Sequence, residues 1–246
     1  MISIIVPNYN HSFVLPLVLR GYNNFPFSDD EVEMVIVDDC SSEPFKEILV
    51  HILKYVKPWF KVRVFETNER TYGPTLPFNI GVKKCHGDII ILNPADIVPT
   101  TEVLPIILRE HKKISNLYLM PKLYINMHGT EWQKTTCGVS MKKKSYEDVG
   151  GYDERFKGIG RQDLDFLARF ERGPFIVKTC REAPSNLVYM HIEIMDPKDP
   201  KKYCIEENSR LLQENTRKGI IKVNPDGWGE LDTLEEVDIA RLLGEN

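Results

Sequence analysis

The stretch "SIIVPNYN", Ser3 to Asn10, joins a short apolar run to a proline, a tyrosine and two asparagines. Two runs of the same kind follow, "EMVIVDD" (33–39) and "DIIILNP" (88–94). Each run is too short for a helix, is rich in Ile and Val, and ends in Pro, Asp or Asn. Such runs are typical of strands buried on both faces of a parallel sheet. We therefore predict an α/β domain that begins here, with a ligand site at the polar end of this first strand.

Helical patterns separate these strands, at about 12–23, 43–57 and 74–86. A fourth run, "KVRVFET" (61–67), alternates between apolar and polar residues and predicts another strand. Strands and helices that alternate in this way indicate right-handed βαβ units.

The regular alternation of strands and helices ends after residue 100. We predict a helix at about 101–114 that leads to the apolar stretch "NLYLMPKLYI" (116–125). Strands follow at 174–179 and 186–192, and then a helix at about 203–218. The chain shows no internal repeat and no strong linker. The pattern favours one domain over residues 1–215, followed by an acidic appendage at 216–246 with a short amphipathic helix.

Composition excludes several classes of protein. A formal net charge of -4 over 246 residues argues against a general nucleic-acid binder, because no excess of cations is present to neutralise phosphates. No apolar run approaches the ~20 residues of a membrane helix, and no leader pattern precedes the first strand. Five scattered cysteines without a CxxC pair indicate thiols in a reducing compartment. We expect a cytoplasmic protein.

Acidic residues stand where the strands end. In an open parallel sheet, ligands bind at the carboxyl ends of the strands. Asp38 and Asp39 follow the second strand and Asp96 follows the third. A carboxylate there can accept hydrogen bonds from a ribose hydroxyl or a base N–H. The alternative is that these residues only end a strand, cap a helix or form a turn.

A loop that could cradle phosphate is missing from the sequence. There is no GxxxxGK[ST], and no GxGxxG after the first strand. A diphosphate would then need a divalent metal held by oxygen ligands as its counter-charge. Asp96 is well placed to bind one. His191 ends another apolar run; a histidine there can be a ligand or an ordinary core residue.

The densest cluster of unusual residues is "GGYDERFKGIGRQDLDFLARF" (150–170). Glycines, aromatics and acids precede a helix that Gln162 and Asp163 open. The helix dipole would favour the ionised carboxylate of Asp163 and give a base that is deprotonated at pH 7. The alternative is that Asp163 only caps the helix.

These segments together resemble the family 2 glycosyltransferases, which have the GT-A fold. The resemblance covers residues 1–215 and rests on "SIIVPNYN", "VIVDDCS", "NIGVKKCHGDIIILNPAD" and the cluster at 150–170, in this order. The last of these resembles the acceptor-side motif of the galactosyltransferase and polysaccharide-polymerase branches. The implied fold is a mostly parallel central sheet flanked by helices. Residues 1–100 would form its nucleotide-sugar half and residues 101–215 its acceptor half.

The resemblance also implies roles for the donor-side residues. Pro7, Tyr9 and Asp39 would hold the nucleoside, with Tyr9 near the base and Asp39 accepting from it. Asn68 or Arg70, after the fourth strand, would lie near the nucleotide.

On the acceptor side, Asp163 matches the catalytic base of the family, with Gly160 and Gln162 beside it in the acceptor-binding motif. Asp96 matches the last acid of an Asp-x-Asp motif that binds Mn²⁺ or Mg²⁺. His191 matches a histidine that completes the metal site in some branches.

The sequence departs from the family pattern in three places. Pro94, with Asn93 beside it, stands where the first acid of the Asp-x-Asp motif is expected. Gln162 replaces a glutamate. Pro77 and Phe78 replace an alanine and an arginine.

The expected function is transfer of a sugar from a UDP-sugar to a hydroxyl of a glycan, glycolipid or other glycoconjugate, by a metal-assisted single displacement that inverts the anomeric centre. The loop "MDPKDPKKY" (195–203) would close over the diphosphate through Lys198, Lys201 or Lys202. One alternative is a protein of this fold that binds a nucleotide sugar or glycan without catalysis. The other is a nucleotidyltransferase, although the glycine- and lysine-rich loop of that class is not seen.

Overall fold

The computed structural model describes residues 1–28, 30–121, 123–126, 131–132, 137–180, 188–192 and 204–244. The helices are α1 (Leu15–Asn23), α2 (Phe45–Val56), α3 (Thr75–Lys84), α4 (Val103–Lys113), α5 (Lys143–Asp148), α6 (Gln162–Arg172), α7 (Ile205–Arg217) and α8 (Ile239–Leu243). The strands are β1 (Ile2–Asn8), β2 (Val32–Asp38), β3 (Lys61–Thr67), β4 (Ile89–Leu92), β5 (Ile97–Pro99), β6 (Leu117–Met120), β7 (Leu123–Asn126), β8 (Glu131–Trp132), β9 (Val139–Lys142), β10 (Ile176–Thr179), β11 (Val188–His191) and β12 (Leu234–Glu236).

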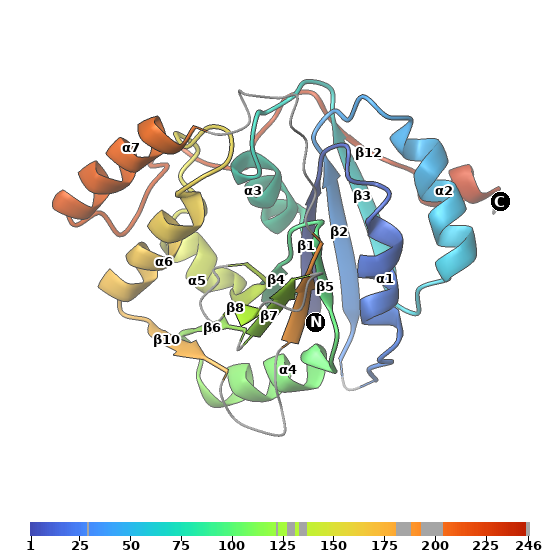
Figure 1. Cartoon of the computed structure of the whole chain (residues 1–246), viewed down its shortest axis with the longest axis horizontal. Helices are drawn as coiled ribbons and strands as arrows, with labels where there is room; N and C mark the ends of the chain where they lie inside the picture. The colour runs from blue at the N-terminus through green and yellow to red at the C-terminus, as the bar shows by residue number, and fades with distance from the viewer. Residues whose placement is uncertain are drawn as a thin grey trace.

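The predicted parallel sheet is the centre of the molecule (Figure 1). Its strand order is β10-β6-β9-β4-β1-β2-β3-β12. β1 pairs in parallel with β2 on one side and β4 on the other, so the first apolar run occupies the middle of the sheet. β9 and β12 run antiparallel to their neighbours. The α/β class and the central sheet flanked by helices are confirmed.

Two apolar clusters cover the two faces of this sheet. Ile4 of β1 belongs to the cluster formed with α1, α2 and α4. Ile5 belongs to the cluster formed with α3, α5 and α6. Successive side chains of a strand point to opposite faces, and both isoleucines have no exposed surface. This is why Ile4, Ile5 and Val6 are apolar in succession, without a polar face.

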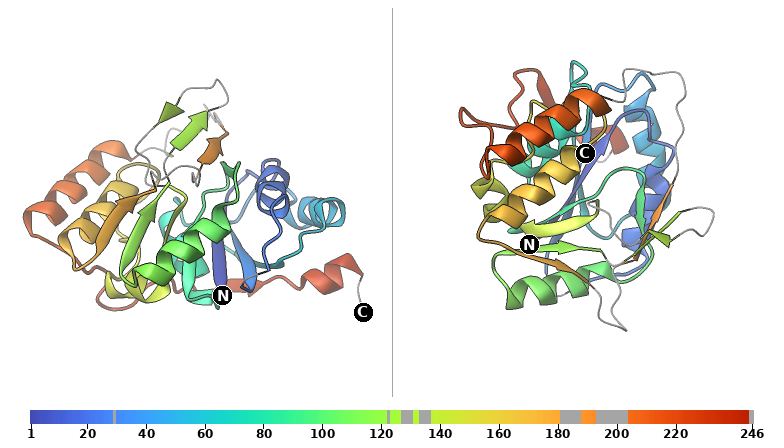
Figure 2. Two further views of the ribbon diagram at one scale, coloured as in Figure 1. Left: turned by 90° about the horizontal axis from the view of Figure 1, so that it is seen from below. Right: turned by 60° about the vertical axis from the view of Figure 1, so that its left-hand side comes forward.

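The apolar stretch at 116–125 does not form a single element. It is two strands, β6 and β7, with Pro121 between them. Proline cannot donate a ladder hydrogen bond, so pairing is interrupted there. β6 stays in the main sheet, whereas β7 joins a second sheet of order β5-β11-β7-β8. In the left view of Figure 2 this small sheet stands apart from the main one.

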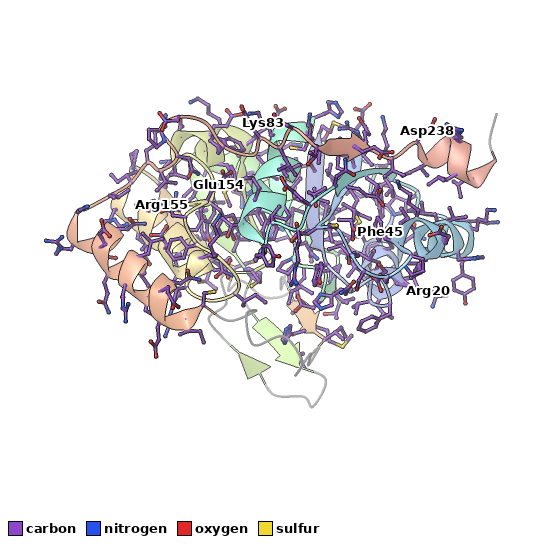
Figure 3. The ribbon with its side chains drawn as sticks, turned by 90° about the horizontal axis from the view of Figure 1, so that it is seen from above. Arg20, Phe45, Lys83, Glu154, Arg155 and Asp238 are labelled. Carbon is purple, nitrogen blue, oxygen red and sulfur yellow. The ribbon has the colours of Figure 1, made fainter. Side chains whose placement is uncertain are left out.

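The chain after α7 crosses the molecule to reach β12 and α8, which lies next to α2 (Figures 1 and 3). β12 pairs antiparallel with β3, and the Trp228 ring lies 5.5 Å from that of Tyr146. The division after residue 215 stays a prediction. Across the described ranges, no helix has the length and apolar character needed to cross a membrane.

Candidate active site

A cavity of about 290 Å³ opens at the carboxyl ends of the central strands, as the sequence predicted. Of the residues proposed from the sequence, it is lined by Pro7, Tyr9, Asp39, Arg70, Asp96, Gln162, Asp163 and His191. They come from β1, the loops after β2, β3 and β4, the start of α6 and the end of β11.

Asp39 follows β2 and turns its carboxyl group into this cavity. The Thr71 backbone N–H donates to Asp39 Oδ1 at 2.7 Å. Burial raises the pKa of Asp39 to about 6, although the hydrogen bonds from Thr71 work in the opposite direction. The neighbouring Asp38 does not line the cavity. Its carboxylate accepts from Asn8 Nδ2 at 2.6 Å and from Ser41 Oγ at 2.6 Å, so Asp38 fixes the loop instead.

Arg70 stacks on tyrosine rings at the edge of the cavity. Its guanidinium carbon lies 3.8 Å from the centre of the Tyr9 ring and 5.0 Å from that of Tyr72. Both distances fall within the range of cation–π attraction. A positive charge therefore stands where the loop after β3 meets the end of β1.

Asn68 lies outside the cavity. The sequence left Asn68 and Arg70 as alternatives near the nucleotide, and of the two only Arg70 lines the cavity. Asn68 is exposed, and its Nδ2 donates to the Thr233 carbonyl oxygen at 2.6 Å. It thus joins the end of β3 to the C-terminal segment.

Asp96 and His191 meet inside the cavity. The His191 Nε2 and Asp96 Oδ2 atoms are 3.2 Å apart, and both side chains are about one-quarter exposed (24% and 27%). Pairing of β11 with β5 aligns His191 with Ile97, next to Asp96. Neither residue is thus buried in the apolar core, and both are accessible to a ligand.

The donor set of this pair suits a divalent cation carried by a nucleotide. Within the described part of the chain, no group of three or more His, Cys, Asp and Glu side chains is arranged to hold a metal ion. Mg²⁺ and similar ions often take only one or two protein ligands and complete their shell with substrate phosphates and water. A carboxylate and an imidazole facing one cavity fit this mode. Lys198, Lys201 and Lys202, predicted to close over the diphosphate, lie outside the described residues.

Asn93, next to the missing first acid, has a different role. Its Oδ1 accepts from the Tyr22 hydroxyl at 2.9 Å, and its Nδ2 donates to the carbonyl oxygens of Pro94 and Ile97, both at 2.8 Å. With no exposed surface, Asn93 holds the turn that presents Asp96.

Asp163 is the second residue of α6 and faces the same cavity. The N-cap residue is Arg161, and no side chain caps this helix, so the capping alternative is wrong. Tyr152 Oη donates to Asp163 Oδ1 at 2.8 Å. Burial raises the pKa of Asp163 to about 6, and the negative charge of Asp96 adds to this. The sequence predicts a base that is deprotonated at pH 7, and a pKa of about 6 leaves the carboxylate mostly ionised there.

The two other acceptor-side residues, Gly160 and Gln162, are hydrogen-bonded to each other. Gly160 N–H donates to Gln162 Oε1 at 2.7 Å, and Gly160 has a φ of +124°, which favours glycine. Gln162 lines the cavity, whereas Gly160 lies beside it, against Ile205. Both shape the loop that leads into α6.

Sequence reasoning missed several residues of the cavity wall. Tyr72, Cys137 and His11 line it without any motif that could have revealed them. Tyr152, the partner of Asp163, stands in the quoted "GGYDE" stretch, but no sequence pattern indicates the direction of its hydroxyl.

The chain is similar in sequence to known proteins. The model of the family "Glycosyl transferase family 2" matches residues 3–180. The poly(ribitol-phosphate) beta-N-acetylglucosaminyltransferase TarS of Staphylococcus aureus (strain Mu50 / ATCC 700699) is 30% identical over 102 residues, which cover 42% of this chain and 17% of TarS. An uncharacterized glycosyltransferase of Haemophilus influenzae (strain ATCC 51907 / DSM 11121 / KW20 / Rd) is 25% identical over 197 residues, covering 71% of this chain and 63% of that protein. The matched stretches thus span less than two thirds of either relative.

The fold has solved counterparts. A crystal structure of S. aureus TarS 1-349 in complex with UDP-GlcNAc superposes with a TM-score of 0.71 at 16% identity, covering 99% of this chain and 70% of that one. The likeness confirms the GT-A architecture. Because the family model matches residues 3–180, which are most of this chain, the chain belongs to glycosyl transferase family 2.

Proposed function

We propose that this protein is an inverting glycosyltransferase that moves a sugar from a UDP-sugar to a hydroxyl of a glycan, glycolipid or other glycoconjugate. One observation carries the proposal: a single cavity brings together Asp39, the Asp96–His191 pair and Asp163. The solved structures of TarS with UDP and with UDP-GlcNAc support a UDP-sugar as the donor.

The nucleoside would bind between the ends of β1 and β2. Thr71 occupies Asp39 Oδ1, which leaves Oδ2 to accept from a base N–H or a ribose hydroxyl. Tyr9 and Arg70 supply a flat surface and a positive charge beside it. Pro7 completes this wall.

The diphosphate would lie against Asp96 and His191. These two side chains would hold Mn²⁺ or Mg²⁺, which when bound offsets the charge that grows on the leaving diphosphate. The Asp96 Oδ2 and His191 Nε2 atoms lie 3.2 Å apart, so the two donor atoms are already close together before the donor arrives. Preorganised groups of this kind need little rearrangement during the reaction.

Asp163 would act as the general base. Its ionised carboxylate takes the proton of the acceptor hydroxyl while the hydroxyl oxygen forms a bond to the anomeric carbon. On the opposite face, the bond from that carbon to the diphosphate oxygen breaks, and UDP leaves with the electron pair. This single displacement inverts the anomeric configuration. General-base assistance contributes about 10²–10⁴ in rate.

The test is UDP release from a panel of UDP-sugars, beginning with UDP-GlcNAc, in the presence of Mn²⁺. We expect turnover by the wild type and a loss of at least about a hundredfold in Asp163→Asn, the lower end of general-base contributions. Donor binding should be retained, because asparagine keeps the shape of the side chain. The matched control is Glu171→Gln, an exposed acid on the same helix. Full activity of Asp163→Asn would exclude this mechanism.

The arrangement of Asn93 favours a second candidate, a nucleotide-sugar binding protein without catalysis. Because its Oδ1 accepts from Tyr22 of α1 and its Nδ2 donates within the turn, Asn93 does not replace the missing first acid as a metal ligand. The same panel decides between the two functions: saturable binding of UDP-GlcNAc without UDP release by the wild type would favour the binding protein.

A further inference from the structure

Tyr152 lies in the loop before α6, and its hydroxyl reaches the carboxylate of Asp163 at 2.8 Å. We propose that Tyr152 is a positioning residue: its hydroxyl holds Asp163 Oδ1, so that Oδ2 is the oxygen directed at the acceptor hydroxyl. This inference rests on the proposed function, because Tyr152 would act only through Asp163 as the general base.

The Tyr152 ring is fixed by stacking on both sides. Its centroid lies 5.4 Å from that of Phe78 with an angle of 26° between the ring planes, and 4.4 Å from that of Phe166 with an angle of 22°. Only 2% of the residue is exposed. Offset stacking of this kind leaves the ring little freedom to rotate, so the position of the hydroxyl is set by the packing.

The backbone of Tyr152 is also fixed. Its N–H donates to Asn79 Oδ1 at 2.9 Å, and its carbonyl accepts from Asn79 Nδ2 at 3.0 Å and from Asn224 Nδ2 at 2.6 Å. Asn79 belongs to α3 and Asn224 to the segment after α7. Figure 3 labels Glu154, two residues further along this loop, whose Oε1 accepts from Asn79 Nδ2 at 2.7 Å and from Gly229 N–H at 2.7 Å. Two separated parts of the chain, α3 and the segment after α7, thus hold the loop that carries Tyr152.

Packing does not account for the hydroxyl group. Phe166 and Phe170 fill the same cluster as plain hydrocarbon rings. A buried hydroxyl is unfavourable unless a hydrogen bond offsets its loss of water, and for Tyr152 the Asp163 carboxylate provides it. Burial also raises the pKa of Tyr152 well above its usual value, so the hydroxyl keeps its proton and acts as the donor. A catalytic carboxylate is oriented by a hydrogen-bond donor whose own position is fixed, and the Tyr152 hydroxyl is such a donor for Asp163.

The first test is Tyr152→Phe, which keeps both ring stacks and removes only the hydroxyl. With UDP-GlcNAc as the donor, we expect kcat for UDP release to fall about tenfold or more, because a charge-assisted hydrogen bond to the base is lost. KM for UDP-GlcNAc should not change, because Tyr152 is absent from the cavity lining.

The matched control is Tyr146→Phe. Tyr146 is equally buried in the same aromatic cluster, but its hydroxyl donates to Asn79 Oδ1 at 2.5 Å and not to Asp163. We expect a small loss of thermal stability and an unchanged kcat. If Tyr146→Phe lowers kcat as much as Tyr152→Phe does, the effect comes from loosening of the cluster and the positioning role is wrong.

The second test is the double variant Tyr152→Phe/Asp163→Asn. If Tyr152 acts through Asp163, removing its hydroxyl from Asp163→Asn should cause no further loss of kcat, so that the two effects are far from additive. Additive losses would overturn the proposal, as would an unchanged kcat in Tyr152→Phe. If Asp163→Asn itself retains full turnover, or the wild type shows none, the proposed function fails and this inference falls with it.

Discussion

Asp96 and His191 are 95 residues apart in the chain, yet their side chains meet at 3.2 Å in the cavity. The small sheet brings them together: β11 pairs antiparallel with β5, and the Ile192 N–H donates to the Asp96 carbonyl oxygen at 2.8 Å. Because the backbone fixes both residues, the spacing of the two side chains is part of the fold.

UDP should stabilise the protein against heat far better with Mn²⁺ than with EDTA, because the described part of the cavity offers the diphosphate no glycine-rich phosphate loop. At a UDP concentration about a hundredfold over Kd, the added free energy of unfolding is about 2.7 kcal/mol. Asp96→Ala should abolish the metal-dependent part of the shift in melting temperature, and His191→Ala should reduce it. Asp88→Ala, an exposed acid at the other end of β4, is the control and should behave as the wild type. Equal shifts with Mn²⁺ and EDTA in the wild type would contradict a metal-bridged diphosphate.

Asp39 and Asn68 should differ sharply in their effect on UDP affinity. Asp39→Asn removes an acceptor inside the cavity and should weaken binding about tenfold or more, since a hydrogen bond to a charged group is typically worth about 1.5–3 kcal/mol. Asn68→Ala should leave Kd unchanged, because Asn68 is bound to Thr233 outside the cavity. Isothermal titration with UDP measures both variants. A larger loss in Asn68→Ala than in Asp39→Asn would contradict the placement of the nucleoside.

The pH dependence of turnover should report Asp163. The base works only when ionised, and its pKa is about 6, raised from the ordinary value by burial and by Asp96. At saturating donor, kcat should therefore be nearly constant above pH 7 and fall about tenfold per pH unit well below pH 6. The other groups near Asp163, Tyr118, Tyr152 and Cys137, all have raised pKa values and stay neutral in this range.

Asp39 also titrates near pH 6, but it should affect binding instead of the chemical step. Its protonation would raise KM and leave kcat at saturation unchanged, which separates the two carboxyl groups. A kcat that stays flat between pH 5 and pH 7 would show that Asp163 is not the base.

Gly229→Ala should destabilise the protein through the C-terminal segment. A Cβ atom at this position would lie 2.7 Å from the Asn79 carbonyl carbon and oxygen, so the segment would have to move away from α3. The control is Gly219→Ala, which has the same φ of +63° but no atom within 4 Å of the new Cβ. Both variants incur the backbone strain of an alanine at positive φ. The melting temperature should therefore fall further in Gly229→Ala than in Gly219→Ala, and the difference measures the clash of the new Cβ with Asn79. Equal losses would mean that the segment does not depend on this contact.

The sequence by itself determined the architecture around the cavity. Runs such as Ile89–Leu92 are apolar at every position because both faces of the central strands are covered, and this pattern is local and readable. The polar residues at the strand ends then place Tyr9, Asp39 and Asp96 at one edge of the sheet, since parallel strands share the direction of their carboxyl ends. Asp163 was recognisable from its motif at the start of a helix.

Only the tertiary structure decided which neighbours these residues have. Nothing in the local pattern distinguishes Arg70, which stacks on Tyr9, from Asn68, which bonds to Thr233 across the molecule. For the ionisation of Asp163, the sequence indicates only the helix dipole, which favours the charged form. The environment of Asp163 depends also on Tyr152 and Asp96, which reach it from other elements, and on burial that no local pattern reports. A dipole or a strand period is a property of one segment, whereas desolvation and hydrogen-bond partners arise only when distant segments pack together.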